Sequence, residues 1–252
     1  METAEFISVL DREGRALAAA AAEAGPDAKV PTCPEWQVRD LLRHTGAVHR
    51  WATSFVALAD PSFRPFGDPP DLDGDALLDW FREGHERLVA TLSAAPPGLE
   101  CWHFLPAPSP LAFWARRQAH ETAVHRVDAE SACGRGPEET ARDLDPAFAA
   151  DGVDELLRGF HARGKSRVRT QTPRVLRVRA TDAAGAAWTV RLSAEPPVTE
   201  RDTGGGAAAD HDCEVSGPAA LLYLSLWNRA PFPTVTGDAT TAALWREKSA
   251  VG

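Results

Sequence analysis

The sequence predicts an α+β protein, in which an N-terminal four-helix bundle is followed by a smaller α+β domain. Two observations lead to this prediction. Up to about residue 133, apolar residues recur every three or four positions, which is the period of a helix with one buried face. Between residues 175 and 192, apolar and polar residues alternate on both sides of a glycine-containing turn, as in a β-hairpin. We place the two domains at residues 1–138 and 139–252.

The first domain is expected to contain four helices, at about residues 2–24, 35–59, 76–93 and 111–133. Gly25-Pro26 ends the first helix, and the turn Pro31–Pro34 precedes the second. Within the second helix, His44 lies three residues after Leu41 and four before Val48. We therefore expect His44 to point into the core of the bundle.

The second domain mixes helices and strands. We expect helices at about residues 146–164, 219–228 and 240–248, a hairpin of residues 175–181 and 188–192, and a strand at residues 212–215. Residues 204–209 are expected to form a flexible loop. Their glycines do not make a phosphate-binding loop, because no Lys-Ser/Thr pair follows them.

Composition excludes several classes of protein. The net charge of −9 argues against nucleic acid and anionic membranes as partners, and no apolar run reaches the length of a membrane span. The four cysteines, Cys33, Cys101, Cys133 and Cys213, form no CxxC pair. We expect reduced thiols in a cytoplasmic protein that is a monomer or a weak homodimer.

The fourth helix carries a possible half of a metal site. Glu121 and His125 are four residues apart, and Asp128 follows three residues later, so all three lie on one stripe of the helix. With His44, the pair Glu121 and His125 offers two imidazoles and one carboxylate, a ligand set of catalytic zinc that leaves one position open. Nickel or another first-row ion would also fit. The alternative is that each is an ordinary polar residue.

Other polar residues of the bundle are ambiguous. Asp128 could accept a hydrogen bond that orients an imidazole, or it could be a surface carboxylate paired with an arginine. His49 and His120 are rotated away from the proposed centre, where they could line the mouth of a pocket or serve structural roles. His85, beside Glu86 on the third helix, is expected to be solvated. We retain His49 and Asp128 as candidate cofactor-binding residues.

Two segments resemble a known family. Thr32–His44, followed by His49-Arg-Trp51, and Arg117–Glu130 resemble the two signatures of the mycothiol-dependent maleylpyruvate isomerase family, within the DinB-like superfamily. The resemblance is weaker in the second domain, through Leu226–Arg229. It implies a DinB-like four-helix bundle with a divalent metal, usually zinc, held by His44, Glu121 and His125.

The resemblance also implies a cosubstrate and a chemistry. The cosubstrate would be mycothiol, the low-molecular-weight thiol of actinobacteria, and the reaction would be S-transfer to a small electrophile or its thiol-assisted isomerisation. Family members use an arginine of the C-terminal domain near the substrate, for which Arg229 is the candidate. Two alternatives remain: a non-catalytic metal- or small-molecule-binding or regulatory protein, and thiol-independent metal-assisted hydrolysis or rearrangement.

Overall fold

The computed structural model describes residues 1–202 and 210–251. These residues form two compact units, the helical unit Met1–Gly136 and the mixed unit Pro137–Gly252. The first unit is built from helices and the second from a sheet with helices, which confirms the predicted fold class. The loop expected at residues 204–209 lies outside the described residues. No helix in the described part of the chain is long and apolar enough to cross a membrane.

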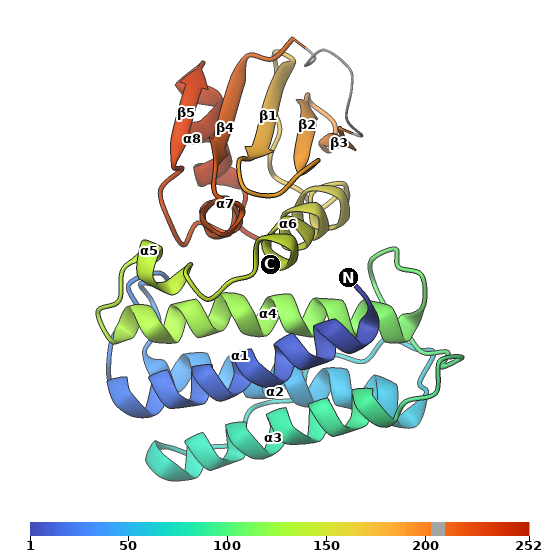
Figure 1. Cartoon of the computed structure of the whole chain (residues 1–252). Coiled ribbons are helices and arrows are strands. Elements are labelled where there is room, and N and C mark those ends of the chain that lie inside the picture. The colour runs from blue at the N-terminus through green and yellow to red at the C-terminus, as the bar shows by residue number, and fades with distance from the viewer. Residues whose placement is uncertain (203–209, 252) are drawn as a thin grey trace. The chain divides into compact units, whose positions relative to one another are not determined.

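The helical unit is a four-helix bundle (Figure 1). Its helices are α1 (Thr3–Ala24), α2 (Val38–Leu58), α3 (Gly74–Ala94) and α4 (Pro110–Ala132). Helix α1 packs mainly against α4 and α3, and α2 packs mainly against α3 and α4. Each helix therefore has two principal neighbours, and α2 and α4 meet along a seam.

Helix α4 has a well-defined start. Ser109 accepts a hydrogen bond from the backbone of Ala112 at 3.1 Å, and Pro110 occupies the first helical position. Serine as a cap and proline in the first turn are both preferred at helix starts. These residues define where α4 begins.

Helix α2 begins three residues later than expected. The backbone of Val30 bonds to that of Trp36 at 3.0 Å, and the backbone of Trp36 bonds to Cys33 at 2.8 Å. Residues 30–36 therefore form a hydrogen-bonded turn, which contains the expected turn Pro31–Pro34 and also Glu35 and Trp36, two residues that we expected in the helix. Gln37 then caps the helix together with Asp40, whose carboxylate accepts from the Gln37 backbone at 2.9 Å.

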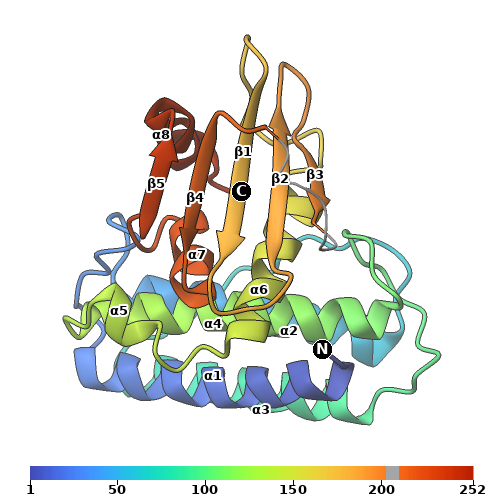
Figure 2. The ribbon, with the colours of Figure 1, turned by 45° about the horizontal axis from the view of Figure 1, so that its top comes forward.

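The mixed unit contains a five-stranded sheet. Its elements are α5 (Pro137–Thr140), α6 (Pro146–Asp154), the π-helix η1 (Glu155–Phe160), β1 (Arg174–Ala180), β2 (Ala187–Leu192), β3 (Val198–Arg201), β4 (Cys213–Gly217), α7 (Ala219–Leu226), β5 (Thr234–Gly237) and α8 (Ala239–Lys248). The strand order is β3-β2-β1-β4-β5, and Figure 2 shows β1 at the centre. Leu176 pairs with Val190 in the antiparallel hairpin β1–β2, which confirms the predicted hairpin.

The two faces of the sheet differ. Leu176, Val178 and Val215 are fully buried, and α7 and α8 pack against β1 and β4. The alternate residues are charged: Arg179 donates to Glu214 at 2.7 Å across β1 and β4. This alternation is the usual pattern of a sheet with one face in the core.

Two features of the mixed unit differ from the expectation. Residues 146–164 do not form one α-helix, because the helix widens at Glu155 into η1, where the backbone of His161 bonds to Leu156 at 3.0 Å. The strands β3 and β5 were not predicted. Both are four-residue strands at the sheet edges and largely exposed, so they lack an alternating apolar pattern.

Candidate metal centre

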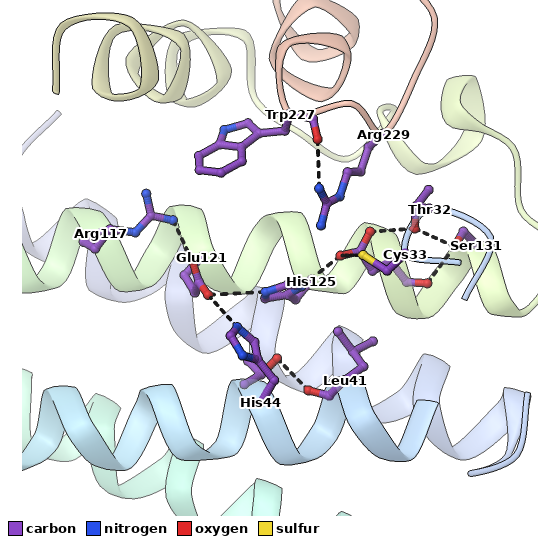
Figure 3. Close-up of polar contacts among 12 residues, drawn as sticks. Thr32, Cys33, Leu41, His44, Arg117, Glu121, His125, Ser131, Trp227 and Arg229 are labelled. Atoms are coloured by element: carbon purple, nitrogen blue, oxygen red, sulfur yellow. Dashed lines mark hydrogen bonds and ion pairs between the residues drawn. The ribbon is translucent and has the colours of Figure 1, made fainter. Parts of the chain in front are cut away.

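Three predicted ligands come together at the α2–α4 seam. His44 and His125 each place Nε2 near Oε1 of Glu121, at 3.2 and 3.3 Å respectively. Figure 3 shows the three side chains pointing toward one another from the two helices. One ligand atom from each lies within 4.8 Å of the others. This spacing suits a single ion shared by the three side chains.

The trio lies at the border between core and solvent. The side chain of His44 is 40% exposed, that of Glu121 22% and that of His125 9%. The expectation that His44 points into the core is therefore wrong. His44 lies in the apolar stripe of α2, but at the edge of the seam between α2 and α4, where a small molecule can reach it.

Asp128 contacts the ring nitrogen of His125 that faces away from Glu121. Nδ1 of His125 donates to Oδ2 of Asp128 at 2.8 Å. Asp128 is fully buried, so the surface-carboxylate alternative is wrong. The carboxylate also accepts from the Thr32 hydroxyl at 2.6 Å and from the Cys33 thiol at 3.6 Å. The turn before α2 thereby anchors the residue that orients His125.

Hydrogen bonds and charge shift the pKa values of Glu121 and His125 in opposite directions. Burial acts to raise the pKa of Glu121, but hydrogen bonds from His125 and His44 outweigh it and hold that pKa well below its usual range. Burial acts to lower the pKa of His125, but Asp128 and Glu121 outweigh it through hydrogen bonds and charge and raise it to about 9. A metal ion that binds here would take the place of the Nε2 proton of His125.

Sequence reasoning missed two residues of the site. Arg117, a buried residue one turn before Glu121 on α4, donates from Nη2 to Oε2 of Glu121 at 3.0 Å. Its spacing from Glu121 was a usable signal, because residues four apart on a helix are neighbours. Trp36 lies against both imidazoles, with ring centroids 5.0 Å from His44 and 5.8 Å from His125. Nothing in its spacing indicates this contact, which depends on the turn of residues 30–36.

The other histidines on the helices of the bundle lie in its interior. His49 is fully buried and within 2.9 Å of the Thr122 hydroxyl, so it does not line the mouth of a pocket. Burial and the neighbouring His85 lower the pKa of His49 well below its ordinary value. His85 is 3% exposed instead of solvated, and its Nε2 lies 3.1 Å from the carbonyl of Leu10. His120 is also buried and meets the ring of Phe6 edge-on.

Arg229 belongs to the mixed unit and lies three residues after the end of α7. Its Nη1 donates to the carbonyl of Trp227 at 2.8 Å (Figure 3). The intervening Asn228 has a φ of 63°, a left-handed conformation that asparagine tolerates better than most residues. The catalytic role of Arg229 stays a prediction.

Comparisons with known proteins agree with this architecture. The family model described as mycothiol maleylpyruvate isomerase N-terminal domain matches residues 8–130, and the model described as MDMPI C-terminal domain matches residues 147–244. Two crystal structures resemble the chain, one of the mycothiol-dependent maleylpyruvate isomerase and one of a histidine-to-alanine mutant of it. Each has a TM-score of 0.62 and 12% identity, over 94% of this chain and 93% of the other. No curated protein sequence matches.

Proposed function

The chain belongs to the mycothiol-dependent maleylpyruvate isomerase family, and we propose that it is a metal-dependent enzyme that uses mycothiol on a small electrophile. The observation that carries this proposal is the meeting of His44, Glu121 and His125 around one point. Two imidazoles and one carboxylate form the protein part of a catalytic zinc site, with a further position left for a water or a substrate. Zinc is the first candidate, and nickel or another first-row ion would suit the same donors.

The chain's own residues would prepare the centre for an ion. Asp128 accepts the Nδ1 proton of His125, so the Nε2 lone pair of that ring is directed at the ion. Trp36 covers one side of both imidazoles. A bound divalent ion would supply Lewis acidity that lowers the pKa of a thiol beside it and so favours the nucleophilic thiolate.

The thiol chemistry would proceed by addition to an activated double bond. The thiolate sulfur forms a bond to carbon, and the π electrons move onto a conjugated carbonyl oxygen. Rotation about the resulting single bond and expulsion of the thiolate complete an isomerisation. If the neighbouring α-carbon of this enolate takes up a proton instead, the S-adduct is the product. Arg229 is our candidate for binding an anionic group of the electrophile, because a guanidinium suits carboxylates.

Metal content and thiol-dependent turnover test the proposal together. We would measure metal by inductively coupled plasma mass spectrometry, and turnover with mycothiol and a panel of electrophiles that includes maleylpyruvate. We expect about one ion per chain, and a loss of both metal and turnover of about 100-fold or more in His44→Ala. His103→Ala is the matched control, because His103 is an exposed histidine in the loop before α4.

Each other outcome points to a different class of protein. A fully metallated and active His44→Ala protein would contradict the proposal. Metal binding without turnover of any electrophile would identify a binding or regulatory protein on the same scaffold. Turnover that does not need the thiol would identify metal-assisted hydrolysis or rearrangement. Protein that neither contains nor takes up a metal would exclude catalysis through this centre.

A further inference from the structure

The two oxygens of the Glu121 carboxylate have different partners. Oε1 faces Nε2 of His44 at 3.2 Å and Nε2 of His125 at 3.3 Å. Oε2 accepts a hydrogen bond from Nη2 of Arg117 at 3.0 Å. From this division we infer that Arg117 is a positioning residue, which holds Glu121 as a one-oxygen ligand and so keeps a coordination position open. The inference rests on the proposed function of the centre.

Arg117 differs from the arginine of an ordinary surface ion pair. Exposed pairs of residues four apart on a helix contribute little, because solvent screens them and the side chains remain mobile. The side chain of Arg117 is only 4% exposed, and that of Glu121 is 22% exposed. A buried guanidinium stays charged and presents its donors in a rigid plane. Arg117 therefore fixes the orientation of the carboxylate before any ion arrives.

The orientation matters because a carboxylate can bind a metal through one oxygen or through two. A Glu121 with a free Oε2 could turn and offer both oxygens to an ion held by His44 and His125. The second oxygen would then take the position that catalytic zinc sites keep for water or substrate. With Oε2 held by Arg117, that position stays available for a thiol.

Cobalt provides a direct readout of this geometry. Co²⁺ replaces zinc in many sites, and its visible absorption is stronger in four-coordinate than in five- or six-coordinate sites, so it reports coordination number. We would load the metal-free protein with Co²⁺ and compare the unmutated chain with Arg117→Met. We expect the visible bands of Arg117→Met to be at least about twofold weaker at equal cobalt content, because Glu121 becomes a two-oxygen ligand.

Three further variants make the comparison specific. Arg117→Gln also removes the charge and fork of the guanidinium, and should show the same weakening if Arg117→Met does not fold. Arg117→Lys keeps a charged donor and should restore most of the intensity. Arg50→Met is the control for loss of a bundle arginine, because Arg50 donates hydrogen bonds to Trp80, Gly46 and Glu83. Its spectrum should match that of the unmutated chain.

The outcomes separate this inference from the proposed function. If the unmutated protein binds no cobalt and no zinc, the proposed function fails and the role of Arg117 fails with it. If the unmutated protein binds cobalt, and Arg117→Met or Arg117→Gln gives an identical spectrum, only the inference is overturned. Equal weakening in Arg50→Met would also overturn it, since the effect would then reflect loss of charge in the bundle.

Discussion

His125 in the helical unit and His161 in the mixed unit are similarly buried imidazoles with opposite affinities for a proton. His125 is 7% exposed and His161 is 2% exposed. Burial lowers the pKa of His161 to about 4. Burial acts in the same direction on His125, but Asp128 and Glu121 outweigh it and raise that pKa to about 9. The neighbours of a buried imidazole, and not its depth, therefore decide whether it is a core residue or part of a polar site.

The contacts of His161 explain why its pKa is low. Its Nδ1 lies 3.0 Å from the Ser166 hydroxyl, and its Nε2 has no hydrogen-bond partner among the described residues. Its ring meets that of Trp245 edge-on at 4.7 Å. A neutral imidazole suits these surroundings, whereas burial disfavours a charged one.

The largest effect that we expect from this comparison is a loss of stability in acid caused by His161. Below its ordinary pKa of 6.5, the unfolded chain takes up a proton on this ring, whereas the folded protein takes it up only near pH 4. The free energy of unfolding therefore falls as the pH drops through this window. The fall due to His161 amounts to about 3 kcal/mol.

Urea unfolding at pH 7 and at pH 4.5 would measure this effect. His161→Phe should remove most of the contribution, so that the variant loses less stability in acid than the unmutated chain. His103→Phe should keep the full loss, because His103 is exposed. Parallel losses in the unmutated chain and in His161→Phe would show that this ring does not resist protonation.

The second-largest expected effect is a loss of zinc affinity when the carboxylate of Asp128, beside His125, is removed. Asp128→Asn preserves the shape of the side chain but removes the charge that faces Nδ1. We expect zinc affinity, measured by competition with a chelator, to fall by about 10- to 100-fold. Asp145→Asn is the control, because Asp145 caps α6 and asparagine caps equally well. Unchanged zinc affinity in Asp128→Asn would mean that Asp128 does not orient the ligand.

The same comparison separates what sequence can predict from what it cannot. The placement of Glu121 and His125 on one stripe follows from helix periodicity, because both belong to the same helix. The meeting of His44 with this stripe depends on how α2 packs against α4, which spacing in one helix does not specify. The deep burial of His161 could not be predicted either, because His161 follows a π-helical turn that apolar periodicity does not indicate.

Glycines in the middle of helices carry a signal that periodicity reasoning overlooks. A Cβ at Gly14 of α1 would lie 2.2 Å from the ring of His85, and one at Gly46 of α2 would lie 2.2 Å from the ring of Trp80. Each glycine makes room for a large side chain from α3. His85 was expected to be solvated because its spacing matches no other candidate ligand. The space beside Gly14 and the carbonyl of Leu10 place it inside instead.

The smallest expected effect is a change in the pKa of His125, caused by the aromatic ring that packs against it. Trp36 is stacked on His125 with an angle of 27° between the rings, whereas Trp245 meets His161 at 66°. A charged imidazole over the face of an indole gains about 0.5–1 kcal/mol. Trp36→Leu should therefore lower the pKa of His125 in metal-free protein by less than about 1 unit, as followed by NMR titration of labelled histidine. Trp80→Leu should leave the pKa of His125 unchanged, because the ring of Trp80 packs against the guanidinium of Arg50. If Trp80→Leu shifts the pKa of His125 as much as Trp36→Leu does, the stacked indole of Trp36 has no specific effect. Asp128 and Glu121 alone would then account for the difference in pKa between His125 and His161.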